Sequence, residues 1–252
     1  MSTTNTRQVI PVADAFFNDG HYYVLTSSSL AGSGMSAEVL AERLQSEQPE
    51  EILDLARLGI CLPVYFDGDC ALDHAVVVIG DLTEQEESEW FARIQGQLNI
   101  PCGEFLLMGG GLEEDFETAL PNAAAPDPHF VFFQKFKVPA GRYLVEIYAF
   151  LNSMSGAIIW EKWPDHEVLA AQWLASGERL PEWLFYFLRG EYYDAEKAGL
   201  QDYIIRLLPL DGPIDPPELV PDANWFGVFD VRRPVAFPRG ISRAGLLDTE
   251  RY

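Results

Sequence analysis

The alternation of apolar and polar residues predicts strands along most of the chain. In residues 143–150, Tyr143, Val145 and Ile147 fall on one face, and the other face is also apolar except at Glu146. A strand that is apolar on both faces is typical of the centre of a sheet. We expect further strands at 21–26, 59–66, 74–79, 105–108, 129–134, 203–208 and 225–231.

Helical spacing is expected at 37–44, 50–58, 83–95, 165–175 and 181–189. The segment 83–95 has the strongest signals, because Thr83 and Glu86 match a capping box and a glycine follows the segment. We expect this segment to be one helix, with Trp90, Phe91 and Ile94 forming its buried stripe.

Two segments share one pattern, in which Pro-x-Gly precedes an aromatic residue and an apolar strand. They read LNIPCGEFLL at 98–107 and FKVPAGRYLV at 136–145. Proline sets φ near −65°, and glycine accepts a positive φ that other residues resist. We therefore expect Gly103 and Gly141 to lie at turns, at least one with positive φ. The match favours two related β units, although common turn chemistry recurring by chance is the alternative.

These segments together predict an α+β fold. We expect a mostly antiparallel sheet or sandwich core built from the two related β units, with inserted helices and a C-terminal helical pair. Residues 1–252 are expected to form a single domain. Within it, an acidic α/β part at 1–128 and a β plus helical part at 129–252 are possible sub-units.

The charge is strongly negative and unevenly distributed. The 252 residues hold 39 Asp and Glu against 17 Lys and Arg, a net charge of −22, and residues 1–130 account for −18 of it. Nucleic-acid binding needs clustered basic side chains, so this composition argues against it and favours a basic protein partner. No apolar run has the length of a membrane span, and neither an export-signal pattern nor a Cys-x-x-Cys pair occurs. We therefore expect a cytoplasmic protein with no membrane association and free thiols; the sequence leaves its oligomeric state open.

Two acidic runs are the candidate binding face for such a partner, with solvated surface as the alternative. Their residues are Glu84, Glu86, Glu87 and Glu89 on the capped helix, and Glu113, Glu114, Asp115 and Glu117 after three glycines.

The segment 67–74 is the densest cluster of potential metal ligands, with Asp67, Asp69, Asp73 and His74. Hard oxygen ligands followed by a histidine can hold a divalent cation. The alternative is a turn with solvated acids, and since a chain this acidic contains such spacings by chance, we expect neither a metal nor another cofactor.

The sequence favours a non-catalytic interaction protein, such as an antagonist of a basic partner, because it contains no recognisable catalytic motif. Two alternatives stay open. One is a metal-assisted enzyme that uses Asp67, Asp69 and His74. The other is a small-ligand binding module lined by aromatic residues, for which Trp160, Trp163 and the Tyr192–Tyr193 pair are available.

Overall fold

The computed structural model describes residues 7–121, 131–193, 198–212, 214–215, 230–234 and 236–248. Within them the strands are β1 (Gln8–Pro11), β2 (Tyr22–Ser27), β3 (Cys61–Tyr65), β4 (Val76–Ile79), β5 (Trp90–Ile100), β6 (Glu104–Gly109), β7 (Phe133–Lys137), β8 (Gly141–Phe150), β9 (Tyr203–Pro209) and β10 (Asp230–Val231). The helices are α1 (Ala37–Leu44), α2 (Pro49–Arg57), α3 (Glu84–Glu89), α4 (Glu113–Ala119), α5 (Met154–Lys162), α6 (His166–Ala175), α7 (Glu182–Leu188) and α9 (Arg243–Asp248), with a short 3₁₀ turn at Leu30–Gly32.

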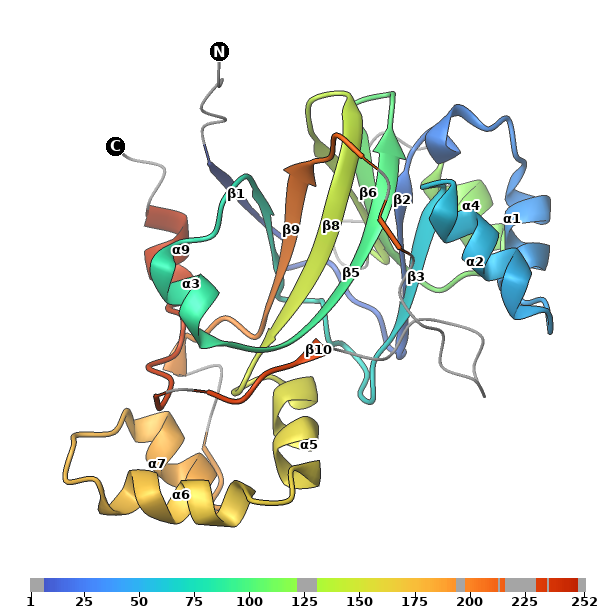
Figure 1. Cartoon of the computed structure of the whole chain (residues 1–252). Coiled ribbons are helices and arrows are strands. Elements are labelled where there is room, and N and C mark those ends of the chain that lie inside the picture. Colours follow the sequence, from blue (N-terminus) through green and yellow to red (C-terminus); the bar gives the residue numbers. More distant parts are fainter. Residues whose placement is uncertain are drawn as a thin grey trace.

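The strands form two sheets (Figure 1). One has the order β1-β4-β9-β8-β5-β10 and the other the order β3-β2-β6-β7. All pairings are antiparallel except β4 with β9. The α+β class with antiparallel sheets and a C-terminal helical pair is therefore confirmed, and β8 is a central strand as expected.

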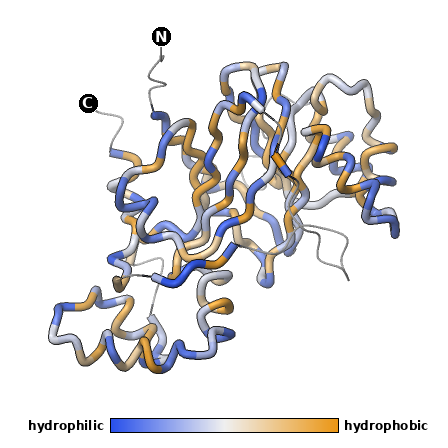
Figure 2. Tube along the Cα trace, viewed as in Figure 1, coloured by the Kyte–Doolittle hydropathy of each residue, from blue (hydrophilic) through white to orange (hydrophobic). Residues whose placement is uncertain are grey.

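The molecule has helical layers outside the two sheets. The main core lies between the sheets, where side chains such as Leu62, Phe105, Ile147 and Ile205 are buried. A second core joins the outer face of the four-stranded sheet to α1, α2 and α4. A third covers the outer face of the six-stranded sheet and includes Leu246 of α9. In Figure 2 the strands of the two sheets are largely orange, whereas the loop between α1 and α2 is blue.

A fourth apolar cluster holds α5, α6 and α7 against one end of the six-stranded sheet. Phe91 of β5 and Leu151 after β8 pack with Trp160, Trp173 and Leu184 of these helices. The helices at 37–44, 50–58, 165–175 and 181–189 are confirmed within a residue or two, whereas α5 was not predicted. Among the described residues, no helix is both long and apolar enough to span a bilayer.

The predicted helix at 83–95 is wrong beyond Glu89. Only Glu84–Glu89 is helical, and Trp90–Ile100 forms β5, which pairs with β8 and β10. The capping box of Thr83 and Glu86 is present. Residues 92, 94, 98 and 100 face the main core at strand spacing, so sheet pairing over eleven residues outweighs the local helical signals. Trp90, Phe91 and Ile94 therefore form no helical stripe.

The two Pro-x-Gly segments are the corners at which the chain crosses between the sheets. The first leads from β5 into β6, and the second returns from β7 into β8. The corners lie side by side, since the Val138 N–H donates to the Gly103 carbonyl at 3.0 Å. Corresponding positions of both segments enter the same core: Leu98 and Phe136, Ile100 and Val138, Phe105 and Tyr143, Leu107 and Val145.

Gly103 has a φ of +73°, as expected for at least one of the two glycines, whereas Gly141 has no positive φ. A duplication as the origin of the two segments stays a prediction. Both sheets combine strands from before and after residue 129, and the division into domains likewise stays a prediction. The strand expected at 225–231 lies outside the described residues except for β10.

Candidate functional site

Helices α1 and α4 pack together on the outer face of the four-stranded sheet (Figure 1). The Ser36 hydroxyl caps α1 by accepting the Val39 N–H at 3.2 Å. The apolar sides of the two helices contain Leu40, Leu44 and Phe116, which are buried against the sheet. The opposite sides of both helices therefore face solvent.

The exposed sides of these helices carry five carboxylates, which we call the α1–α4 acidic surface. They are Glu38 and Glu42 on α1 and Glu113, Glu114 and Glu117 on α4. Partial desolvation raises the pKa of Glu113, and the charges of the other four raise it further. Within the described part of the chain, none of the five forms an ion pair.

Asp115, which the sequence placed in the same binding face, has a structural role. Its Oδ2 accepts the backbone N–H groups of Gly111 at 3.0 Å and Leu112 at 2.9 Å. These bonds order the turn before α4 and satisfy donors at the start of the helix. The Asp115 carboxylate therefore stabilises the turn before α4, and its Oδ2 is already hydrogen-bonded.

The acids of α3 are also partly used by the fold. Glu86 is buried, accepts two hydrogen bonds from the Arg7 guanidinium at 2.6 and 2.7 Å, and accepts the Thr83 N–H at 2.8 Å. Glu89 accepts the Gly240 N–H at 2.7 Å. Including Glu86 in an exposed face was therefore wrong, because its carboxylate is needed to neutralise Arg7 inside the protein. Glu84 and Glu87 are exposed.

The two acidic runs do not form one face. Helix α3 lies beside α9 on the six-stranded sheet, whereas α4 lies on the outer face of the four-stranded sheet (Figure 1). The structure instead brings α4 next to α1, whose Glu38 and Glu42 belong to neither acidic run. Only the packing of the helices shows that residues 75 positions apart share a surface.

The segment 67–74 connects β3 and β4, which lie in different sheets. Asp73 is buried and accepts the Tyr23 hydroxyl at 2.9 Å and the Asn18 N–H at 3.1 Å. Burial raises the pKa of Asp73, and the hydrogen bonds oppose this shift. Asp67, Asp69 and His74 are exposed. Among the described residues, no three His, Cys, Asp or Glu side chains are grouped to hold a metal ion.

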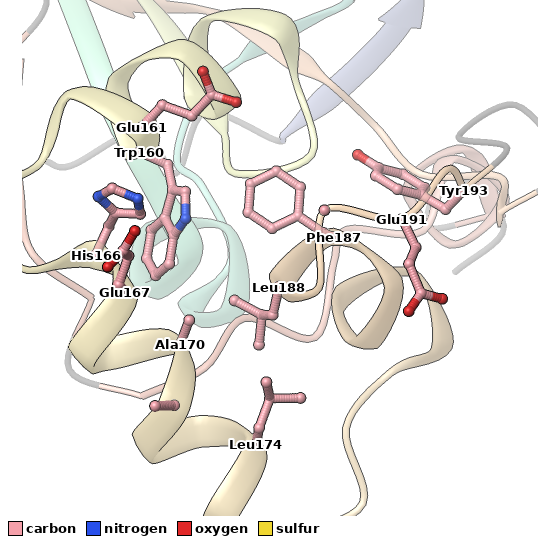
Figure 3. Close-up of a pocket in the computed structure, with 12 residues that line it drawn as sticks. Trp160, Glu161, His166, Glu167, Ala170, Leu174, Phe187, Leu188, Glu191 and Tyr193 are labelled. Atoms are coloured by element: carbon pink, nitrogen blue, oxygen red, sulfur yellow. The ribbon is translucent and has the colours of Figure 1, made fainter.

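A cavity of about 460 Å³ lies among α5, α6 and α7 (Figure 3). Trp160, Phe187 and Tyr193 contribute aromatic rings to its wall, together with His166 of α6. Trp163, one of the aromatic residues available for a ligand site, is half-buried against Phe91, with ring centroids 5.2 Å apart. The Ser153 hydroxyl caps α5 at Gly156, a serine signal that the sequence analysis missed.

No family model matches the chain, and no curated protein matches it. Among solved structures, one titled "Crocagin biosynthetic gene J" matches with 12% identity and a TM-score of 0.36, covering 81% of this chain and 95% of that one. ComJ from Bacillus subtilis, described as an inhibitor of the DNA-degrading activity of NucA, matches with 8% identity and a TM-score of 0.29, covering 83% and 99%. Neither likeness places this chain in a family.

Proposed function

We propose that the protein is a non-catalytic interaction protein that binds and antagonises a basic protein through the α1–α4 acidic surface. The observation that carries this proposal is the gathering of five exposed carboxylates from two helices that are distant in sequence, with no ion-pair partner in the described part of the chain. A basic partner would supply the missing positive charge, and the field of the surface would accelerate encounter.

The demands of the fold account for only some of these charges. Glu38, Glu113 and Glu114 lie in the first turns of their helices, where a negative charge interacts favourably with the helix dipole. Glu42 and Glu117 lie beyond the first turn, and repulsion among like charges opposes folding. Glu42 and Glu117 are therefore better explained by a role in binding than by a role in stabilising the fold.

The same two helices also expose apolar side chains. Val39 of α1 is 41% exposed and Leu112, directly before α4, is 50% exposed. Protein interfaces commonly combine apolar contacts with a polar rim. These two residues are therefore candidates for the direct contacts, while the carboxylates guide the approach.

The test is affinity capture from an extract of the source organism with three purified baits. These are the wild type, a surface variant with Glu38, Glu42, Glu113, Glu114 and Glu117 changed to Gln, and a charge-matched control. The control changes five exposed acids elsewhere: Glu84→Gln, Glu87→Gln, Glu182→Gln, Asp211→Asn and Asp248→Asn.

We expect a basic protein to be retained by the wild type and the control and lost by the surface variant. Capture of the same proteins by all three baits, or no protein that depends on the five carboxylates, would reject the proposal. Loss with the control variant alone would also reject the proposal, because binding would then depend on acids outside the α1–α4 acidic surface.

A further inference from the structure

The cavity among α5, α6 and α7 has an apolar floor. Trp160 is buried with its indole stacked on Trp173, with centroids 5.5 Å apart, and Phe187 lies 6.0 Å from the Trp160 ring. Leu188 and Leu174 extend this apolar surface (Figure 3). A cavity of about 460 Å³ is within the usual range for small-molecule sites.

The polar groups around this floor are mostly hydrogen-bond acceptors. Glu161, Glu167 and Glu191 line the cavity, and no Lys or Arg is among its described lining residues. Figure 3 shows Glu161 above Trp160, Glu167 beside His166, and Glu191 on the far side of Phe187 and Leu188. Glu191 pairs with Arg189, whereas Glu161 and Glu167 have no ion-pair partner among the described residues.

His166 adds a further acceptor. Its Nδ1–H donates to the Trp163 carbonyl at 2.6 Å, so in the neutral ring Nε2 is left with its lone pair. The Tyr193 hydroxyl donates its proton to the Asn152 carbonyl at 3.1 Å. The Gly190 and Glu191 N–H groups donate to the Phe187 and Tyr186 carbonyls. These donors are therefore not available to a ligand.

The ends of the helices also favour a positive charge. α5 and α7 end beside the cavity, next to Glu161 and Gly190, so the negative ends of two helix dipoles lie near it, partly offset by the charges of Lys162 and Arg189. The N-terminus of α6 lies on the third side, where Glu167 places a negative charge and Asp165 is paired with Arg233 at 2.8 Å.

We propose that this cavity binds a small organic cation with an apolar body, such as an arylalkylammonium ion. The apolar part packs on Trp160, Phe187 and Leu188, and the ammonium group lies near Glu161, Glu167 and His166. An anion would meet the carboxylates without a free cation to pair with, and a neutral compound would gain only the apolar contacts. This proposal is independent of the α1–α4 acidic surface.

The test is isothermal titration calorimetry of the full chain with three probes of similar shape. They are 2-phenylethylammonium, 2-phenylethanol and 3-phenylpropionate. The variant Glu161→Gln/Glu167→Gln removes two exposed charges, so the fold should be retained. Ala171→Arg places a cation on an exposed lining position of α6. Glu182→Gln outside the cavity is the matched control.

We expect one saturable site for the ammonium probe, weaker binding of the alcohol and no binding of the carboxylate. The double variant should bind the ammonium probe about threefold to tenfold more weakly, because two partly solvated ion pairs are lost. Its affinity for the alcohol should be unchanged. Ala171→Arg should abolish ammonium binding, and Glu182→Gln should not change it. Equal affinity for the three probes, no saturable binding of the ammonium probe, or binding insensitive to Ala171→Arg would overturn the proposal.

Discussion

At the scale of single residues, Gly103 shows how the backbone restricts side-chain choice. Its φ is +73°, and an added Cβ would lie 3.1 Å from the Val138 carbonyl oxygen of the neighbouring corner. Gly141 occupies the matching sequence position without positive φ, and a Cβ there would lie 3.8 Å from the Tyr143 ring. The Pro-x-Gly pattern thus indicated both turns but could not show which glycine is conformationally required.

We expect Gly103→Ala to lower the free energy of unfolding by about 1 kcal/mol or more, since alanine is strained at positive φ. Gly141→Ala should be close to neutral. Urea denaturation of both variants checks the pair, and equal effects would contradict the assignment of the first corner.

Asp202 gives the stability a pH dependence that can be tested. Burial raises its pKa to about 6, against the opposing effects of the Asn152 hydrogen bond and the Arg243 charge. The pKa in the unfolded chain is about 3.9. Between these values the folded state binds the extra proton, so Asp202 makes stability fall as pH rises from about 4 to about 6.

Asp202→Asn should remove this contribution while its side-chain oxygen still accepts the Asn152 N–H. As the pH rises from 4 to 7, the free energy of unfolding of the variant should increase relative to that of the wild type by up to about 3 kcal/mol. Denaturation curves at several pH values measure this difference. Curves that stay parallel across the window would show that Asp202 is not the responsible group.

At the scale of elements, the start of α3 could be predicted from local sequence, whereas the boundary between α3 and β5 could not. The capping box correctly located the start of α3, because it depends only on Thr83 and the residue three positions later. The end of α3 depends on pairing with β8, more than 40 residues away. The strand spacing of Ala92, Ile94 and Leu98 was present in the sequence but was outweighed by the preceding helical signals.

Helix α5 packs unusually closely on the end of β8. A Cβ on Gly156 would lie 2.1 Å from the Phe150 carbonyl oxygen, so this helix needs glycine to approach the strand. Gly245 in α9 is a helical glycine whose Cβ would meet Ser242 at 3.5 Å, an ordinary contact.

We therefore expect Gly156→Ala to destabilise the protein by about 1–3 kcal/mol, as overpacking does. Gly245→Ala should stabilise it by about 0.5–1 kcal/mol through helix propensity. Thermal denaturation of both variants provides the comparison. A stabilising Gly156→Ala would contradict the close packing of α5.

At the scale of the whole molecule, the sequence indicated the excess of acid but not its arrangement. The negative charge of residues 1–130 could be counted directly, whereas the separation of α3 from α4 and the approach of α1 required the fold. Burial of Glu86 was also hidden, because its partner Arg7 is 79 positions away and the sequence contains no signal for this ion pair. The α5–α7 cavity could not be predicted, since its wall comes from three helices, one of which was missed.

The α1–α4 acidic surface should destabilise the isolated protein. Changing Glu42 and Glu117, which lie beyond the first turns of α1 and α4, to Gln is expected to raise the melting temperature at low salt, because repulsion among like charges is removed. The gain should shrink at high salt, where the Debye length falls from about 10 Å at 0.1 M to about 3 Å at 1 M. A melting temperature that falls in the variant would mean that these charges serve the fold.

The most direct test of the proposed function is the rate at which the protein associates with the basic partner retained in the capture experiment. Stopped-flow association would be measured from about 0.05 to 1 M salt for the wild type, the five-carboxylate surface variant and the charge-matched control. If the α1–α4 acidic surface guides binding, the surface variant should associate more slowly than the wild type at low salt and depend less on salt, while the control follows the wild type closely. Association of the surface variant at the wild-type rate across this range would contradict the account.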